Sequence, residues 1–143
     1  MTALNFQSIE DKLFRLDAHI RIIEGVLVHT DKEIIDESTL YYTLEHMLQL
    51  NIQIILDIGA HILAEQFHEN TKTYAEVIVE LGTHGVVTKE FAASQEGMAE
   101  FRNKLVHDYD LIDKTKTVRY GRVAPQEFRS FGKAFTNFIE KQK

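Results

Sequence analysis

Four side chains that can carry charge or donate hydrogen bonds fall within about two helical turns near residue 105. They are a guanidinium, a carboxamide, an imidazole and a phenol, at Arg102, Asn103, His107 and Tyr109. Each residue of an ideal helix advances about 100°, so the apolar residues of this stretch fall on a separate side. Those that can face a core are Met98, Phe101 and Leu105. The pattern predicts an amphipathic helix that is anchored on one side and presents polar groups on the others.

The arginine and the histidine together suit chemistry on a phosphate ester. A histidine side chain titrates near physiological pH, so His107 can accept or donate a proton. The planar, permanently charged guanidinium of Arg102 matches the geometry of phosphate. The pair could cleave RNA without a metal: the imidazole would handle the proton of the 2′-hydroxyl or of the leaving oxygen, and the guanidinium would stabilise the phosphorane. Asn103, one turn before His107, could orient the imidazole or a phosphate oxygen.

A structural alternative exists for the same residues, and helix geometry complicates the catalytic one. Arg102 could pair with Glu100 or Asp108, while His107 merely caps the end of the helix. The side chains of Arg102 and His107 also diverge by about 140° on one helix. A complete site would then need two copies of the helix that meet around a two-fold axis.

A rival cluster lies on an earlier helix, where Asp57, His61, Glu65 and His68 share one face. The last three could chelate a transition metal or zinc. Only one Glu-x-x-His pair occurs, whereas a di-iron bundle needs two. We therefore favour a polar stripe and expect neither a metal nor a cofactor. Asp57 and His61 are candidates to project toward the motif helix and support the catalytic pair.

Composition limits the classes of protein to consider. The 143 residues are expected to form a single domain spanning 1–143, and the chain has no cysteine. We expect no secretory signal, because the N-terminal residues lack its basic region and apolar run, and we expect no apolar segment long enough to span a bilayer. These expectations favour a cytoplasmic protein without a membrane partner. The net charge of −6 argues against a general nucleic-acid coat, so we expect no DNA and only local contact with RNA.

Basic residues gather in one run without an intervening acid, at Lys114, Lys116, Arg119 and Arg122. This run is either a solvated loop or a phosphate contact.

The hydrophobic periodicity and the near absence of proline predict an all-α protein. Helices are expected over about 6–29, over 74–81, over 88–109 and from Pro125 onward. Between the first two of these, a long second helix is expected to end near Phe67. Thr30 with Glu33 has capping-box spacing, and Ser38 or Thr39 is another possible start for the second helix. Short connections favour an antiparallel bundle of four main helices plus a short one, with the phenylalanines of the last helix in the core.

Three glycine and proline positions carry more specific expectations. Gly59 either allows another helix to approach closely or is a tolerated weak spot. Gly82 is a plausible C-cap. Residues 110–124 are expected to form a loop, and Pro125 suits the first turn of the last helix.

The stretch from Arg102 to Tyr109 resembles the Arg-x4-His-x-Tyr motif of HepT-like proteins, a branch of the HEPN superfamily. The resemblance extends over nearly the whole chain, through residues 57–62, 74–81 and 85–87. It implies a HEPN-like helical bundle that dimerises with its motif helices facing each other, and metal-independent ribonuclease activity as the toxin of a toxin–antitoxin pair.

The same resemblance assigns roles to residues and to a partner. Arg102 and His107 would be the catalytic pair, Asn103 a supporting group and Tyr109 an acceptor of AMP. The antitoxin would be a minimal nucleotidyltransferase of the MNT type, which transfers the AMP. The alternative is a noncatalytic binding module that presents a substrate or Tyr109 to a nucleotidyltransferase.

Overall fold

The structure, a computed structural model, describes residues 3–107 and 112–143. Within these residues there are seven helices and no strand, which confirms the all-α prediction. The helices are α1 (Phe6–Val26), α2 (Asp31–Asp36), α3 (Ser38–Phe67), α4 (Tyr74–Thr83), α5 (Lys89–Ser94), α6 (Glu96–His107) and α7 (Lys114–Gln142).

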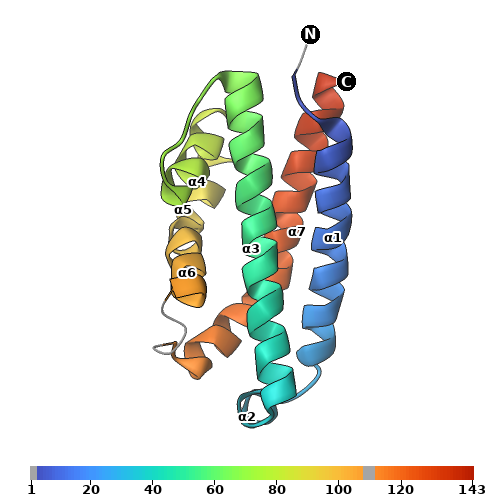
Figure 1. Cartoon of the computed structure of the whole chain (residues 1–143), viewed down its shortest axis with the longest axis vertical. Helices are drawn as coiled ribbons and strands as arrows, with labels where there is room; N and C mark the ends of the chain where they lie inside the picture. The colour runs from blue at the N-terminus through green and yellow to red at the C-terminus, as the bar shows by residue number, and fades with distance from the viewer. Residues whose placement is uncertain (1–2, 108–111) are drawn as a thin grey trace.

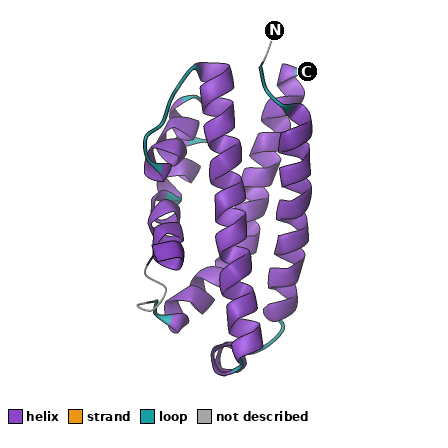
Figure 2. Ribbon diagram, viewed as in Figure 1, coloured by secondary structure: helices purple, strands orange, loops and turns teal. Residues whose placement is uncertain are grey.

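The chain alternates in direction and forms the expected antiparallel bundle (Figures 1 and 2). Three long helices, α1, α3 and α7, pack on one another. The shorter α4, α5 and α6 run back along α3 and take the place of the fourth main helix. The predicted motif helix is thus two helices, α5 and α6, which meet at the buried residue Gln95.

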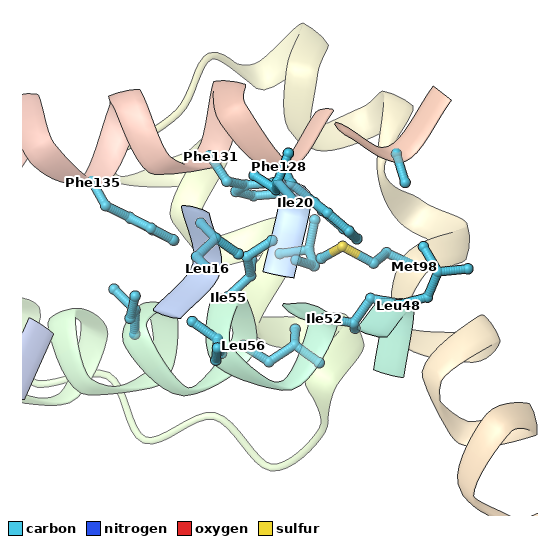
Figure 3. Packing of buried hydrophobic residues seen from close by; sticks show 14 of the residues in the cluster. Leu16, Ile20, Leu48, Ile52, Ile55, Leu56, Met98, Phe128, Phe131 and Phe135 are labelled. Carbon is cyan, nitrogen blue, oxygen red and sulfur yellow. The ribbon is translucent and has the colours of Figure 1, made fainter. Parts of the chain in front are cut away.

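Aromatic residues at helical spacing on α7 fill the centre of the bundle. Phe128, Phe131 and Phe135 are fully buried. Figure 3 shows them against apolar side chains of α1 and α3, among them Leu16 and Ile55. A buried stripe of this period stabilises a helix mainly through the apolar area it removes from water. The prediction that the phenylalanines of the last helix form the core is confirmed for these three, whereas Phe138, the fourth predicted, is half-buried and packs against the core.

α3 is the helix around which the others pack. Among the described residues it is the one helix long and apolar enough to cross a membrane, with an 18-residue window of mean hydropathy 1.4, so the expectation that no segment has that length is wrong. It is the core helix here: it contacts α1, α2, α4, α6 and α7. Its buried Asn51 donates to the carbonyl of Leu16 at 3.3 Å and contacts His19 Nδ1 at 2.9 Å, so the polar group is satisfied.

The caps explain where two of the shorter helices begin. Thr30 and Glu33 form the predicted capping box before α2, and the hydroxyl of Thr88 accepts from the backbone N–H of Phe91 at the start of α5. Gly82 is not a C-cap: it lies inside α4, where an added Cβ would meet the Cβ of Ala92 at 2.8 Å. The turn after α4 is made instead by Gly85, whose φ is 73°.

Gly59 marks the closest approach of α3 and α4. A Cβ on it would lie 2.8 Å from Val77 Cγ1 and 2.9 Å from Leu81 Cδ1. Of the two sequence-based readings of this glycine, the structure supports the close approach. The consequence is that α4 lies tightly against the middle of α3.

The loop predicted over 110–124 is wrong from Lys114 onward. Asp113 caps α7, its carboxylate accepting from the backbone N–H groups of Thr115 and Lys116. Pro125 therefore lies inside the helix rather than in its first turn. Proline removes a backbone donor and bends a helix, and the first turns of α7 run at an angle to the rest (Figure 1).

Candidate functional site

Arg102 joins α6 to two other helices. Its Nε donates to Oε1 of Gln53 on α3 at 2.9 Å. Its guanidinium carbon lies 4.7 Å from the ring centroid of Tyr74, the first residue of α4. An aromatic face and an amide oxygen both stabilise a cation, so the half-buried guanidinium is held in place without being neutralised.

Gln53 is itself fixed by its neighbours. Its Nε2 donates to Asp57 Oδ1 at 2.7 Å and lies 3.4 Å from the hydroxyl of Tyr74. With the amide nitrogen occupied in this way, the amide oxygen is turned toward Arg102. Asp57, which was expected to project toward the motif helix, reaches Arg102 only through Gln53.

Sequence reasoning missed Gln53 and Tyr74. Gln53 lies one turn before Asp57 on α3, a spacing that favours a side-chain pair. Its contact with Arg102, 49 residues away, depends on how α3 and α6 pack. Tyr74 carried a clearer signal, since it opens a helix directly after the capping residue Thr73.

The other predicted catalytic residues lie at the exposed end of α6. Asn103 is exposed, and its Oδ1 accepts from Arg102 Nη1 at 3.3 Å. His107 is exposed in the last turn of α6. Among the described residues, no hydrogen bond joins Arg102 to His107, as expected for side chains five positions apart on one helix. Tyr109 lies outside the described residues.

The structural alternative for Arg102 finds no support in Glu100. The carboxylate of Glu100 lies 3.6 Å from Lys104 Nζ, in an exposed i,i+4 pair. Asp108, the other acid considered, lies outside the described residues. Within the described part of the chain, the guanidinium of Arg102 has no carboxylate partner, which leaves its charge available to a ligand.

On the polar face of α3, His61 contacts the start of α1 rather than the motif helix. His61 Nε2 accepts a hydrogen bond from the backbone N–H of Asn5, the N-cap of α1, at 3.0 Å. The expectation that His61 projects toward the motif helix is therefore corrected: a backbone donor before the first turn of a helix needs an acceptor, and His61 supplies it. His68 ends α3 in a left-handed conformation with φ 56°. The described structure does not gather His61, Glu65 and His68 into one metal-binding group.

The basic run belongs to α7, and part of it holds the bundle together. Arg122 donates to Asp31 Oδ1 at 2.7 and 2.9 Å and to the carbonyls of Leu27 and His29 at 2.7 and 2.8 Å. Lys114 Nζ lies 4.8 Å from the ring centroid of Tyr41. Burial raises the pKa of the Tyr41 phenol, so this ring stays neutral beneath the lysine. Arg122 and Lys114 both belong to α7, so neither is part of a solvated loop.

Comparison with known proteins supplies the family. A family model described as ribonuclease HepT-like matches residues 16–133. The tRNA nuclease HepT of Aphanizomenon flos-aquae (strain 2012/KM1/D3) is 30% identical over 95 residues, which are 66% of this chain and 65% of that protein. The chain thus spans less than two thirds of the length of that relative.

Two solved structures share the fold. YutE of Bacillus subtilis, described as a cytosolic protein of unknown function, has a TM-score of 0.87 at 20% identity, covering 99% of this chain and 95% of YutE. The tri-AMPylated HEPN toxin of Shewanella oneidensis, solved in complex with an MNT antitoxin, has a TM-score of 0.81 at 20% identity, covering 90% of this chain and 96% of the toxin. The fold and the family model both point to the family that the motif on α6 resembles. The chain belongs to the HepT-like ribonuclease family of HEPN proteins.

Proposed function

We propose that this protein is a metal-independent endoribonuclease and the toxin of a toxin–antitoxin pair in the cytoplasm. The observation that carries the proposal is the guanidinium of Arg102, which Gln53 and Tyr74 hold between three helices with no carboxylate to neutralise it among the described residues. A half-buried guanidinium that is held in place and not neutralised can bind the negative charge of a phosphodiester. The family and the toxin–antitoxin complexes with the same fold add support.

The chemistry needs two chains. Arg102 and His107 diverge on α6, so a homodimer with its α6 helices facing each other would bring the arginine of one chain near the histidine of the other. One imidazole takes the proton of the 2′-hydroxyl, and the 2′-oxygen attacks phosphorus. The P–O5′ bond then breaks, and the 5′-oxygen leaves with the proton that this imidazole took up. Arg102 stabilises the phosphorane charge, and Asn103 orients a phosphate oxygen.

The partner would be a minimal nucleotidyltransferase of the MNT type that transfers AMP to Tyr109. Such a modification adds negative charge and bulk two residues after His107, next to a site that must admit RNA phosphate. The HEPN toxin with the same fold that was solved tri-AMPylated with its MNT antitoxin supports this proposal. Tyr109 follows the C-terminal end of α6, which is exposed at His107.

Expression of the protein without an antitoxin tests the nuclease. The wild type should arrest growth and degrade RNA, and Arg102→Ala or His107→Ala should each lower the cleavage rate by about 100-fold or more. Arg15→Ala, which removes an exposed arginine of α1, is the matched control and should cleave like the wild type. Equal growth and intact RNA in the wild type and both motif variants would refute the nuclease.

Mixing the two inactive variants tests the composite site. If arginine and histidine act across the dimer, co-expressed Arg102→Ala and His107→Ala chains should form some mixed dimers with one intact pair, and part of the activity should return. No recovery in demonstrated mixed dimers would place both residues on one chain.

A second candidate function is a noncatalytic module that presents Tyr109 or a substrate to a nucleotidyltransferase. The net charge of −6 favours it, because RNA phosphate is repelled by an acidic protein. Mass spectrometry after incubation with such an enzyme and ATP distinguishes the two. AMP on Tyr109 together with no RNA cleavage by the unmodified protein would favour the module.

A further inference from the structure

Three side chains that are ordinary metal ligands converge beside the C-terminal end of α4. Glu69 comes from the connection after α3, and Glu80 and His84 come from the last turn of α4 and its C-cap. Each side chain offers one atom that could bind a metal, and these three atoms lie within 4.8 Å of one another. This set differs from His61, Glu65 and His68, the cluster that the sequence offered and that we interpreted as a polar stripe.

The distances within the cluster suit a shared ion better than direct hydrogen bonds. His84 Nε2 lies 3.5 Å from Glu69 Oε1 and 3.5 Å from Glu80 Oε2. A good N–H···O bond is about 2.7–3.2 Å long, and Nε2 is a buried atom with no hydrogen-bond partner. A tetrahedral ion with bonds of about 2.0–2.2 Å holds neighbouring ligand atoms about 3.3–3.5 Å apart.

The backbone and a neighbouring ring hold the three ligands in position. The imidazole of His84 stacks on Phe67, with centroids 4.3 Å apart and planes at 24°. The backbone N–H of His84 donates to Glu80 O at 2.9 Å, and that of Glu69 donates to Leu63 O at 2.9 Å. Small side-chain movements are therefore enough to close the ligands around an ion.

The charges in the cluster lack a counter-ion. Glu69 and Glu80 both face His84, and in the described part of the chain neither is paired with a lysine or an arginine. Two carboxylates beside one imidazole repel each other, and a divalent cation between them would attract both. A buried, unpartnered imidazole nitrogen between two carboxylates is thus a place where a cation would be stabilised.

We propose that Glu69, Glu80 and His84 bind a divalent transition ion of the zinc class. One imidazole and two carboxylates are ligands that zinc accepts, whereas Mg²⁺ prefers an octahedral set of oxygens. The ion would fasten the connection between α3 and α4 to the far end of α4. That helix also carries Tyr74, which supports Arg102. The proposed site is structural and does not depend on the ribonuclease activity.

Zinc binding to the purified protein, first stripped with a chelator, tests the proposal. Isothermal titration with ZnCl2 should give one ion per chain, and the melting temperature should rise with zinc. His84→Ala and Glu80→Gln should each weaken binding by about tenfold or more, because each removes one of three ligands. Glu65→Gln, the same change in an exposed glutamate of α3, is the matched control and should bind like the wild type. MgCl2 should neither bind nor raise the melting temperature.

Three results would overturn the site. These are no zinc binding by the wild type, equal binding by the wild type and Glu80→Gln, or loss of binding in the Glu65→Gln control. Glu80→Gln keeps the size and helix propensity of the residue, so it should fold even if His84→Ala does not. Circular dichroism of each variant without metal verifies folding before the titrations are compared.

Discussion

The bundle of α1, α3 and α7 and the layer of α4, α5 and α6 are held together by different kinds of contact. In the bundle, long helices bury continuous apolar stripes, and the phenylalanines of α7 fill the space between α1 and α3. In the layer, the longest helix within the described residues is α6, with 12 residues. The layer also buries apolar side chains such as Val77 and Met98, and adds to them the close approach at Gly59 and the polar contacts of Arg102.

This difference shows how a helical protein can combine stability with an available charge. A helix of 12 residues or fewer is marginal by itself, so the layer depends on α3 for its position. In return, the layer can keep a half-buried arginine that a well-packed apolar core would not tolerate. The four changes below test this division, and their expected effects decrease in order.

Phe131→Ala should cause the largest loss, because it empties the centre of the bundle. Phe131 is fully buried and its ring lies 4.8 Å from that of Phe91. Truncating a buried phenylalanine costs about 3–5 kcal/mol of unfolding free energy. Urea unfolding measures this loss of unfolding free energy. Phe14→Ala is the control, since Phe14 is 78% exposed. Equal losses in the two variants would contradict the core assigned to α7.

Gly59→Ala tests how closely α4 packs against α3. The added methyl group would meet Val77 and Leu81 at less than 3 Å, and overpacking of this kind costs about 1–3 kcal/mol. Gly25→Ala on α1 is the matched control, because nothing lies within 4 Å of its added Cβ. The control should gain up to about 1 kcal/mol from helix propensity. Stabilisation by both changes would mean that α4 does not approach α3 so closely.

Gln53→Leu should release Arg102 with little effect on the bundle. A lost hydrogen bond to a half-buried group costs about 1 kcal/mol, and the Nε–H resonance of Arg102 should move toward that of a free arginine. Gln7→Leu is the control, since Gln7 donates to Asp11 at 2.8 Å in the same i,i+4 arrangement on α1. An unchanged Arg102 resonance in the Gln53 variant would show that Tyr74 alone holds the guanidinium.

The smallest effect should come from the exposed pair of Glu24 and Arg129, which are joined by two hydrogen bonds of 2.8 Å. The hydrogen bond from Arg129 lowers the pKa of Glu24, so the pair stabilises the fold above the ordinary glutamate pKa of about 4.3. That contribution is lost as the pH falls through the lower folded value. The difference in unfolding free energy between the wild type and Glu24→Gln, at most about 1 kcal/mol at neutral pH, should then vanish.

High salt is the control for this pair, because screening should reduce the difference at neutral pH as well. A difference that persists both in acid and in salt would mean that the glutamine disturbs packing rather than charge.

The sequence predicted the long elements well because their signals are local. The apolar period of α3 and the capping box at Thr30 each depend on residues within a few turns. The start of α7 was missed because Pro125 is a strong local signal for a first turn, whereas the cap that decides the matter is Asp113. The break at Gln95 was missed because it lies within an otherwise continuous helical pattern.

The candidate site was predictable only in its motif. Arg102 and His107 stand out by residue type and by resemblance to a family. Gln53 does not, since its role follows from the packing of α3 against α6. His61 was predicted to face the motif helix, but the sequence does not show which group a histidine on a polar face contacts. In the structure it accepts a hydrogen bond from the backbone N–H of Asn5. The roles of Arg102, Asn103 and His107 stay predictions.

The hydrogen bond from Arg102 Nε to Gln53 restricts the direction from which a phosphate can arrive. A guanidinium offers paired N–H groups along its Nε edge and along its outer edge between the two terminal nitrogens. Gln53 occupies the Nε edge. In the proposed complex a phosphate would therefore meet the outer edge, where Asn103 Oδ1 already accepts from Nη1 at 3.3 Å.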